Sequence, residues 1–229
     1  LPIEGVTSTG IANWTKIAYQ SYKDGDSEIY VANGDGADVQ VITNNAAADF
    51  GSRLNRGATR LVFASDRDGN IEIYTSQVDG QNPLRLTTHI AEDYSPDWSP
   101  DGSQIIFVSE RDGNSELYLM NSNGSGQVRL TIDSRIDTNP AWSPDGQQIA
   151  WVRALGNSGA VWLMNADGSN QRLLISELPY LGTVAWSPDG YRLFYDYDSD
   201  GDYWNELLSY TFINAATNTI YDANQDFVD

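Results

Sequence analysis

The sequence contains no cysteine and only one histidine, His89, among its 229 residues. Without cysteine the chain has neither a disulfide framework nor a thiol nucleophile. A zinc site needs several imidazole or thiolate ligands, which this chain does not supply. Nothing near His89 marks a nucleophile that it would activate, and no Gly-x-Ser-x-Gly motif occurs. The sequence therefore predicts no catalytic residues and a protein that is not an enzyme.

Basic residues are also scarce, with 13 Lys and Arg against 32 Asp and Glu and a net charge of −19. Nucleic-acid binding depends on neutralising phosphates, and anionic membrane surfaces attract basic segments. The composition therefore argues against both, while it permits cations and basic protein partners. No apolar run is long enough to span a bilayer, so no membrane insertion is expected, and no signal peptide is present in this sequence.

A sustained helical period is absent, but a much longer period runs through the whole chain. Aromatic residues recur at intervals of 44 positions: Tyr19, Phe63, Phe107, Trp151 and Tyr195. An apolar residue two positions earlier keeps the same interval in all five units. A period of this length is typical of a protein built from repeated structural units.

Each unit consists of short runs rich in Val, Ile, Leu and aromatic residues, separated by turn residues. The pairs Asp68-Gly69 and Asp112-Gly113 lie in register, whereas the fourth unit has Gly156-Asn157 instead. In the fifth unit the later positions move by two residues, which predicts a two-residue insertion near Gly201. Such runs bounded by Asp-Gly are typical of β-hairpins. About four antiparallel strands in a unit of this length predict the blade of a β-propeller.

We therefore predict an all-β protein with a single β-propeller domain of about five four-stranded antiparallel blades over residues 1–229. The blades fall approximately at 1–44, 45–88, 89–132, 133–176 and 177–222, and a C-terminal tail follows at 223–229. Five periods of 44 residues make 220 of the 229 residues, which favours a closed five-bladed ring. The alternative is a partial or open arc of a six-bladed propeller.

A sharper motif marks the turn between the first two strands of three units. Trp-Ser-Pro-Asp-Gly begins at Trp98, Trp142 and Trp186, and together with the later turn at Asn165 to Gly168 it resembles the WD-like repeat of TolB-like propellers. The resemblance covers almost the whole chain, although the first two units depart from the motif. It implies a binding module that works with protein partners outside the cytoplasm, in the periplasm or the extracellular space.

Several repeated residues are expected to serve the fold. The Trp-Ser-Pro-Asp-Gly residues set a turn and fill space between neighbouring blades. Glu28, Glu72 and Glu116 precede the third-strand aromatic residue and are expected to pair with a donor in a neighbouring strand. Arg67 and Arg111 share a register and are the candidate partners.

A second acidic series consists of Asp49, Asp93 and Asp137, which are again 44 residues apart. Each precedes the first strand of its unit, the strand expected to line the central channel. Three carboxylates around a narrow mouth would focus negative potential on a partner or ligand. In the alternative interpretation, each aspartate caps its own turn. The aromatic candidates for contact at the same rim, which would otherwise pack against the next blade, are Phe50, Tyr94 and Tyr180.

The fifth unit contains the most suggestive metal-ligand pattern of the chain. Its candidate ligands are Asp196, Asp198, Asp200, Asp202 and Glu206. Alternating carboxylates on a turning loop converge, and their hard oxygens suit Ca²⁺. The pattern departs from an EF-hand loop at the twelfth position, which is Leu207. Calcium is thus the one cofactor that the sequence suggests, and no cofactor is required.

The leading interpretation is a non-catalytic binding module whose rim loops mediate a protein–protein interaction outside the cytoplasm. One alternative is a saccharide-binding lectin that uses the Tyr- and Trp-rich rim. The other is a carboxylate-based hydrolase or lyase that acts on saccharides in the central channel.

Overall fold

The computed structural model describes residues 16–23, 25–198, 206–212 and 221–222. These residues form nineteen β-strands, and they contain no helix that could cross a membrane. The strands of the first half are β1 (Lys16–Ser21), β2 (Glu28–Asn33), β3 (Gln40–Val41), β4 (Asp49–Leu54), β5 (Arg60–Ser65), β6 (Glu72–Gln77), β7 (Leu84–Arg85), β8 (Asp93–Trp98), β9 (Gln104–Ser109), β10 (Glu116–Asn121) and β11 (Val128–Arg129). Those of the second half are β12 (Ile136–Trp142), β13 (Gln148–Leu155), β14 (Ser158–Asn165), β15 (Arg172–Pro179), β16 (Val184–Trp186), β17 (Arg192–Tyr197), β18 (Glu206–Thr211) and β19 (Tyr221–Asp222).

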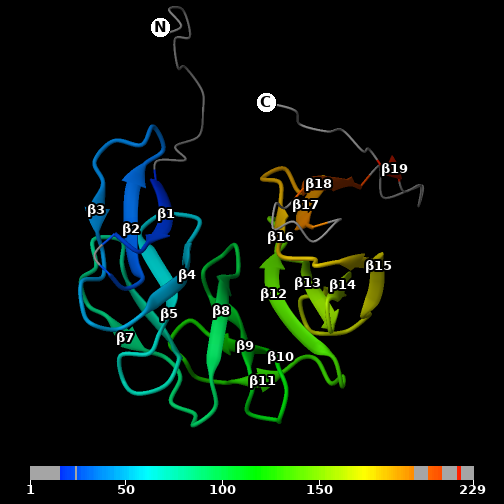
Figure 1. Ribbon diagram of the computed structural model, residues 1–229, viewed down its shortest axis with the longest axis horizontal. Coiled ribbons are helices and arrows are strands. Elements are labelled where there is room, and N and C mark those ends of the chain that lie inside the picture. The colour runs from blue at the N-terminus through cyan, green and yellow to red at the C-terminus, as the bar shows by residue number, and fades with distance from the viewer. Residues whose placement is uncertain (1–15, 24, 199–205, 213–220, 223–229) are drawn as a thin grey trace, which may run out of the picture.

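Consecutive strands form five antiparallel sheets, which we call blades 1 to 5. Blade 1 has three described strands, β1–β3, and blades 2 to 5 have four each. The first strands of blades 2 to 5 pack beside one another near the centre, and blades 1 and 5 stand at the two ends of the arc (Figure 1). The predicted all-β propeller with five antiparallel blades is confirmed.

The aromatic period has a direct structural cause in the pairing of the two central strands of each blade. Phe63 of β5 lies opposite Tyr74 of β6, and their ring centroids are 5.9 Å apart. The same pairing recurs in blades 1, 3 and 4. In blade 5, Tyr195 lies opposite Leu208, so the offset along the chain grows from eleven residues to thirteen. This shift confirms the predicted two-residue insertion.

The blades pack face to face, and the same strand positions make every interface. Ile29 and Val31 of blade 1 pack with Leu61 and Phe63 of blade 2 in one buried cluster. The corresponding positions join blade 2 to blade 3, blade 3 to blade 4 and blade 4 to blade 5. Because no single sheet covers its own apolar faces, stacking supplies the core of the molecule.

The Trp-Ser-Pro-Asp-Gly turns are closed by local hydrogen bonds. In blade 4, Ser143 Oγ donates to Asp145 Oδ1 at 2.6 Å and accepts from the amide of Gln148 at 2.9 Å. Gly146 ends the turn with a φ of 73°, which favours glycine. Trp142 is buried in the cluster between blades 3 and 4. The motif thus sets the turn and fills the interface behind it.

Candidate functional site

The three repeated aspartates begin the first strands of blades 2, 3 and 4. Asp49 is the first residue of β4, Asp93 is the first residue of β8, and Asp137 is the second residue of β12. Each of them is fully buried. Buried carboxylates need compensating donors, so the groups that surround them decide what these residues do.

Each buried carboxylate is bound by an arginine of its own blade. Arg67 Nη2 lies 2.7 Å from Asp49 Oδ1, and Arg111 Nη2 lies 2.9 Å from Asp93 Oδ2. Burial nevertheless raises the pKa of Asp93 above its ordinary value, because desolvation outweighs the hydrogen bonds that Ser109 and Arg111 donate to it. The pairs tie the first strand of a blade to the end of its second strand.

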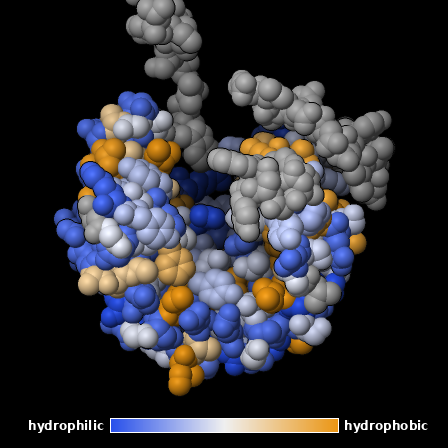
Figure 2. Space-filling view, viewed as in Figure 1, coloured by the Kyte–Doolittle hydropathy of each residue, from blue (hydrophilic) through white to orange (hydrophobic). Residues whose placement is uncertain are grey.

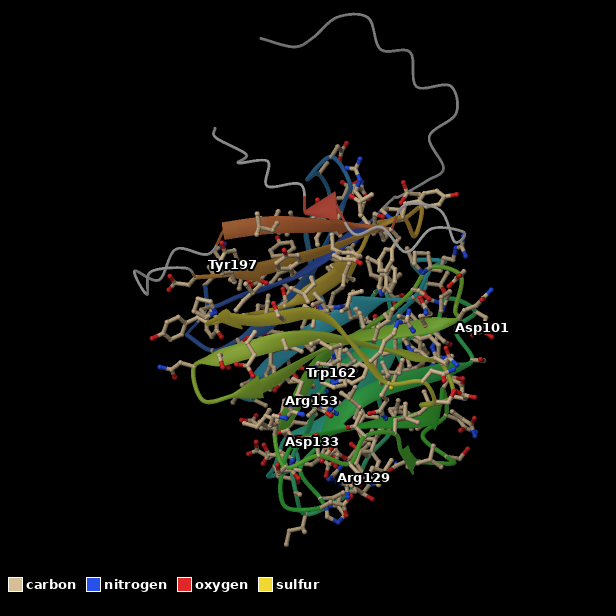
Figure 3. All side chains as sticks on the ribbon, turned by 90° about the vertical axis from the view of Figure 1, so that its right-hand side faces the viewer. Asp101, Arg129, Asp133, Arg153, Trp162 and Tyr197 are labelled. Atoms are coloured by element: carbon tan, nitrogen blue, oxygen red, sulfur yellow. The ribbon has the colours of Figure 1, made fainter. Side chains whose placement is uncertain are left out.

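Blade 4 makes the same ion pair from a different position. Arg153 binds Asp137 through Nε and Nη2, at 2.6 and 2.7 Å, and its guanidinium stacks 4.4 Å from the centroid of a Trp162 ring (Figure 3). Asp133 joins the group through Arg153 and Arg135, at 3.3 and 2.9 Å. The hydrogen bond from Arg135 is the main reason why the pKa of Asp133 lies well below its usual range.

The predicted partners of the repeated glutamates were wrong. Glu72 pairs with Arg85 at 2.7 Å, and Glu116 pairs with Arg129 at 2.9 Å, so both arginines come from the outermost strand. In blade 1, Val41 occupies the arginine register, and Glu28 accepts a hydrogen bond from the amide of Asn45 instead. Arg67 and Arg111 are unavailable to the glutamates because Asp49 and Asp93 bind them.

The three aromatic candidates differ in how much of each ring reaches solvent. Phe50 and Tyr94 are partly buried, and the Tyr94 hydroxyl lies 2.8 Å from Ser115 Oγ. Burial raises the pKa of Tyr94. Tyr180 is exposed in the loop between blades 4 and 5, and its hydroxyl accepts a hydrogen bond from Asn157 at 3.2 Å. Of these three rings, Tyr180 is the one most available to a partner.

Large apolar side chains are exposed in the loops that connect one blade to the next. Ile90, between β7 and β8, is 91% exposed, and Ile132, between β11 and β12, is 81% exposed. Ile136 at the start of β12 and Tyr180 are also exposed. Every such loop joins the last strand of one blade to the first of the next, so these residues lie at the same end of the propeller. We call Ile90, Ile132, Ile136 and Tyr180 the rim patch.

Sequence reasoning missed the isoleucines of the rim patch. Their signal was an isolated isoleucine within a polar loop, such as Ile90 between His89 and Ala91. A single exposed isoleucine is common in proteins. The repetition of exposed apolar residues in three successive loops distinguishes them, and only the strand boundaries make that repetition visible.

Acidic side chains surround the rim patch. Glu92 and Glu110 are exposed at the ends of β8 and β9, and Glu177 is exposed on β15. Among the residues that the structure describes, no arginine, lysine or histidine forms an ion pair with these three glutamates. The rim therefore combines apolar contact area with acidic side chains that form no ion pair among the described residues, although Arg135 lies close enough to Glu177 to attract it.

The first strand of blade 3 carries an acidic residue where blades 2, 4 and 5 have Arg53, Ala141 and Ala185. Asp97 of β8 accepts a hydrogen bond from the amide of Trp142 in blade 4 at 2.9 Å. Burial raises the pKa of Asp97 to about 6, although Arg53 on the neighbouring blade favours the ionised form. Figure 2 shows hydrophilic residues around the hollow between the two sides of the arc.

The predicted calcium ligands lie only partly within the described residues. Asp196 Oδ1 accepts hydrogen bonds from the amide and hydroxyl of Thr183, at 2.6 and 2.5 Å. Asp198 is buried. Asp200 and Asp202 lie outside the described residues, as does the side chain of Glu206. Within the described part of the chain, no group of three His, Cys, Asp or Glu is arranged to hold a metal ion. The calcium site stays a prediction.

Comparison with known proteins gives the architecture a family. Residues 9–221 match the family model described as the TolB beta propeller domain. Among solved structures, a putative TolB from Agrobacterium tumefaciens is similar, with 26% identity, a TM-score of 0.69 and coverage of 77% of this chain and 68% of that chain. TolB from Acinetobacter baumannii is also similar, with 19% identity, a TM-score of 0.75 and coverage of 87% of this chain and 51% of that chain.

A chain of the nidogen/laminin complex shares the fold, with 14% identity, a TM-score of 0.70 and coverage of 86% of this chain and 72% of that chain. No curated protein matches the sequence. This chain spans about half of the Acinetobacter protein. The family model spans nearly all of the sequence and agrees with the blades described above. The chain therefore belongs to the TolB β-propeller domain family.

Proposed function

We propose that this chain is a non-catalytic binding module that docks a protein partner on the rim patch. The observation that carries the proposal is the repeated exposure of large apolar side chains in three successive interblade loops. Binding residues are often found on loops that a rigid scaffold positions, and the stacked blades provide such a scaffold. Burial of exposed isoleucine and tyrosine side chains would supply the favourable free energy of docking.

The charges around the rim patch define the chemistry of the partner. Glu92, Glu110 and Glu177 are exposed near the patch, and the chain as a whole carries a net charge of −19. A partner that offers arginine or lysine around an apolar centre would be attracted and oriented by this field. The expected partner is therefore a protein with a basic rim around an apolar contact surface.

Family membership supports a location outside the cytoplasm, in the periplasm or the extracellular space, where TolB-type propellers work with partners of the cell envelope. The similar chain in the nidogen/laminin complex lends general support to protein binding by this fold. Fold alone does not assign a function, so the proposal depends on the rim patch and on its test.

The test compares the wild-type chain with a rim variant that carries Ile90→Asp and Ile132→Asp. Immobilised proteins are exposed to an envelope fraction of the source organism, and retained proteins are identified and then titrated by calorimetry. We expect the rim variant to lose a partner that the wild type binds. Val128→Asp is the matched control, because Val128 is about half exposed but lies on the outer strand β11. Equal binding by the rim variant and the wild type would contradict the proposal.

A further inference from the structure

The two end blades expose side chains whose counterparts are buried in every interior interface. Ile17 and Tyr19 of β1 are 48% and 37% exposed, and Leu207 of β18 is 58% exposed. The residues at the Ile17 and Tyr19 positions in blades 2 to 5 are at most 6% exposed. The residues at the Leu207 position in blades 1 to 4 are all fully buried: Ile29, Ile73, Leu117 and Val161.

The interior interfaces follow one rule, which identifies what these exposed positions would normally contact. The Leu207 position of a blade packs against the Ile17 and Tyr19 positions of the following blade. Leu117 of blade 3, for example, shares a buried cluster with Ile149 and Trp151 of blade 4. The three other interfaces show the same combination of positions.

The chain thus carries both halves of one more interface of the same kind. Blade 5 presents the surface that a following blade would cover, and blade 1 presents the surface that a preceding blade would cover. The two surfaces stand at opposite ends of the arc, and the described strands of blades 1 and 5 do not pack as successive blades do (Figure 1). Among the described residues, no further blade covers either surface, so a second copy could supply the matching one.

We propose that blade 5 of one copy docks on blade 1 of a second copy, with Leu207 packed against Ile17 and Tyr19. The contact would continue the established pattern of interblade packing, and it needs no residue type that the interior interfaces lack. It is a head-to-tail contact, so each copy uses two different surfaces and the assembly grows beyond a dimer unless it closes. This surface is separate from the rim patch, and the proposal does not depend on the protein-binding function.

Charge gives the association a recognisable salt dependence. Each copy carries a net charge of −19, so copies repel one another at low ionic strength. Added salt screens this repulsion between copies. We expect self-association to increase with sodium chloride, whereas docking of a basic partner on the rim patch would weaken.

The sharpest test uses two variants that each disable one surface, Ile17→Asp and Leu207→Asp. Sedimentation velocity over a concentration series is expected to show oligomers of the wild type and roughly tenfold weaker association of either variant alone. An equimolar mixture retains one intact pair of surfaces, so it should form a heterodimer and nothing larger. Ile90→Asp is the control that removes an exposed isoleucine elsewhere and should associate like the wild type.

Three results would overturn the proposal: a monomeric wild type at every concentration and salt level, undiminished association of either single variant, or a mixture that stays monomeric.

A pair of introduced cysteines distinguishes contact between two copies from closure of the ring within one chain. Because the chain has no cysteine, Ile17→Cys combined with Leu207→Cys introduces the only thiols. Disulfide-linked oligomers are expected on a non-reducing gel. A disulfide formed only within single chains would show that the ring closes on itself and would exclude the contact between copies.

Discussion

Asp137 and Arg153 form a buried two-point ion pair that blade 4 builds from a different position than its neighbours. In blades 2 and 3 the arginine lies just beyond the second strand, at Arg67 and Arg111, whereas Arg153 lies within β13. Within the repeat the aspartate keeps its position, whereas the arginine of blade 4 lies two residues earlier than the arginines of blades 2 and 3. The pairing of the two groups is therefore retained, although the position of the arginine is not.

Blade 5 has apolar side chains at the two positions of this ion pair. The same apolar pair can therefore be introduced into blade 4 as a test. Leu181 and Tyr197 occupy the positions of Asp137 and Arg153, and both pack against the neighbouring apolar cluster. Asp137→Leu alone should reduce the free energy of unfolding by about 3 kcal/mol, because the buried Arg153 loses its two-point partner and keeps only the longer contact with Asp133. The double variant with Arg153→Tyr should recover most of this loss. Urea denaturation measures both, and a double variant no more stable than the single one would refute the exchange.

Titration of Asp97 should lower the free energy of unfolding as the pH rises from about 4 to 6. Burial raises its pKa from 3.8 to about 6 in the folded state, so the folded protein holds this proton over a range in which the unfolded chain loses it. The folded state therefore binds more protons there, and the free energy of unfolding falls with pH by about 2 kcal/mol.

Asp97→Asn removes this titration while it keeps an acceptor for the Trp142 amide. We expect the variant to be more stable than the wild type at pH 7 and nearly equal to it at pH 4. Thermal melting of both proteins across this range gives the comparison. An identical pH dependence of the two proteins would show that Asp97 does not carry the effect.

Two glycines allow the stability cost of a strained backbone conformation to be measured apart from the cost of a clash between blades. Gly113 and Gly124 both have positive φ, at 100° and 86°. A Cβ at Gly113 would meet nothing within 4 Å, whereas one at Gly124 would lie 2.6 Å from the carbonyl oxygen of Leu86 in the preceding blade. Gly113→Ala should cost about 1 kcal/mol for its backbone strain, and Gly124→Ala about 2 kcal/mol more. Chemical denaturation tests the difference, and equal losses would rule out the interblade clash.

The calcium prediction has a direct test in thermal melting with millimolar calcium chloride and then with excess chelator. A cation that binds the folded chain raises the melting temperature by mass action. If the acids from Asp196 to Glu206 bind Ca²⁺, the midpoint rises and the chelator reverses the rise. Asp198→Asn should reduce the shift, whereas Asp145→Asn, in a turn of blade 4, should not. An unchanged midpoint would remove calcium from the properties of this chain.

The repeat made the architecture predictable because the same contacts recur in each blade. Strand positions, turns and the insertion near Gly201 all followed from register, since one aromatic pair and one apolar interface are built at every period. The partners in the ion pairs were harder to predict from the sequence. Arg67 lies near both an aspartate and a glutamate in register, and only the path of the strands shows that it reaches Asp49.

The rim patch could not be predicted from the sequence for a different reason. Asp49 and its counterparts were conspicuous in the sequence because they repeat, yet the structure buries them beneath the rim. Ile90 and Ile132 occupy different places within their repeats, so no period connects them. The interblade loops come together through the stacking of successive blades, which a pattern along the sequence does not encode.

The one-sided packing of the end blades also has a consequence for how the molecule comes apart. Among the described residues, blades 2, 3 and 4 each pack against two neighbouring blades, whereas blades 1 and 5 each pack against one. In such a nearest-neighbour array, opening is easiest at the ends and hardest in the middle. Amide protons of β9 and β10 would then exchange with solvent most slowly, and a copy docked at either end would convert a fraying terminus into an interior one.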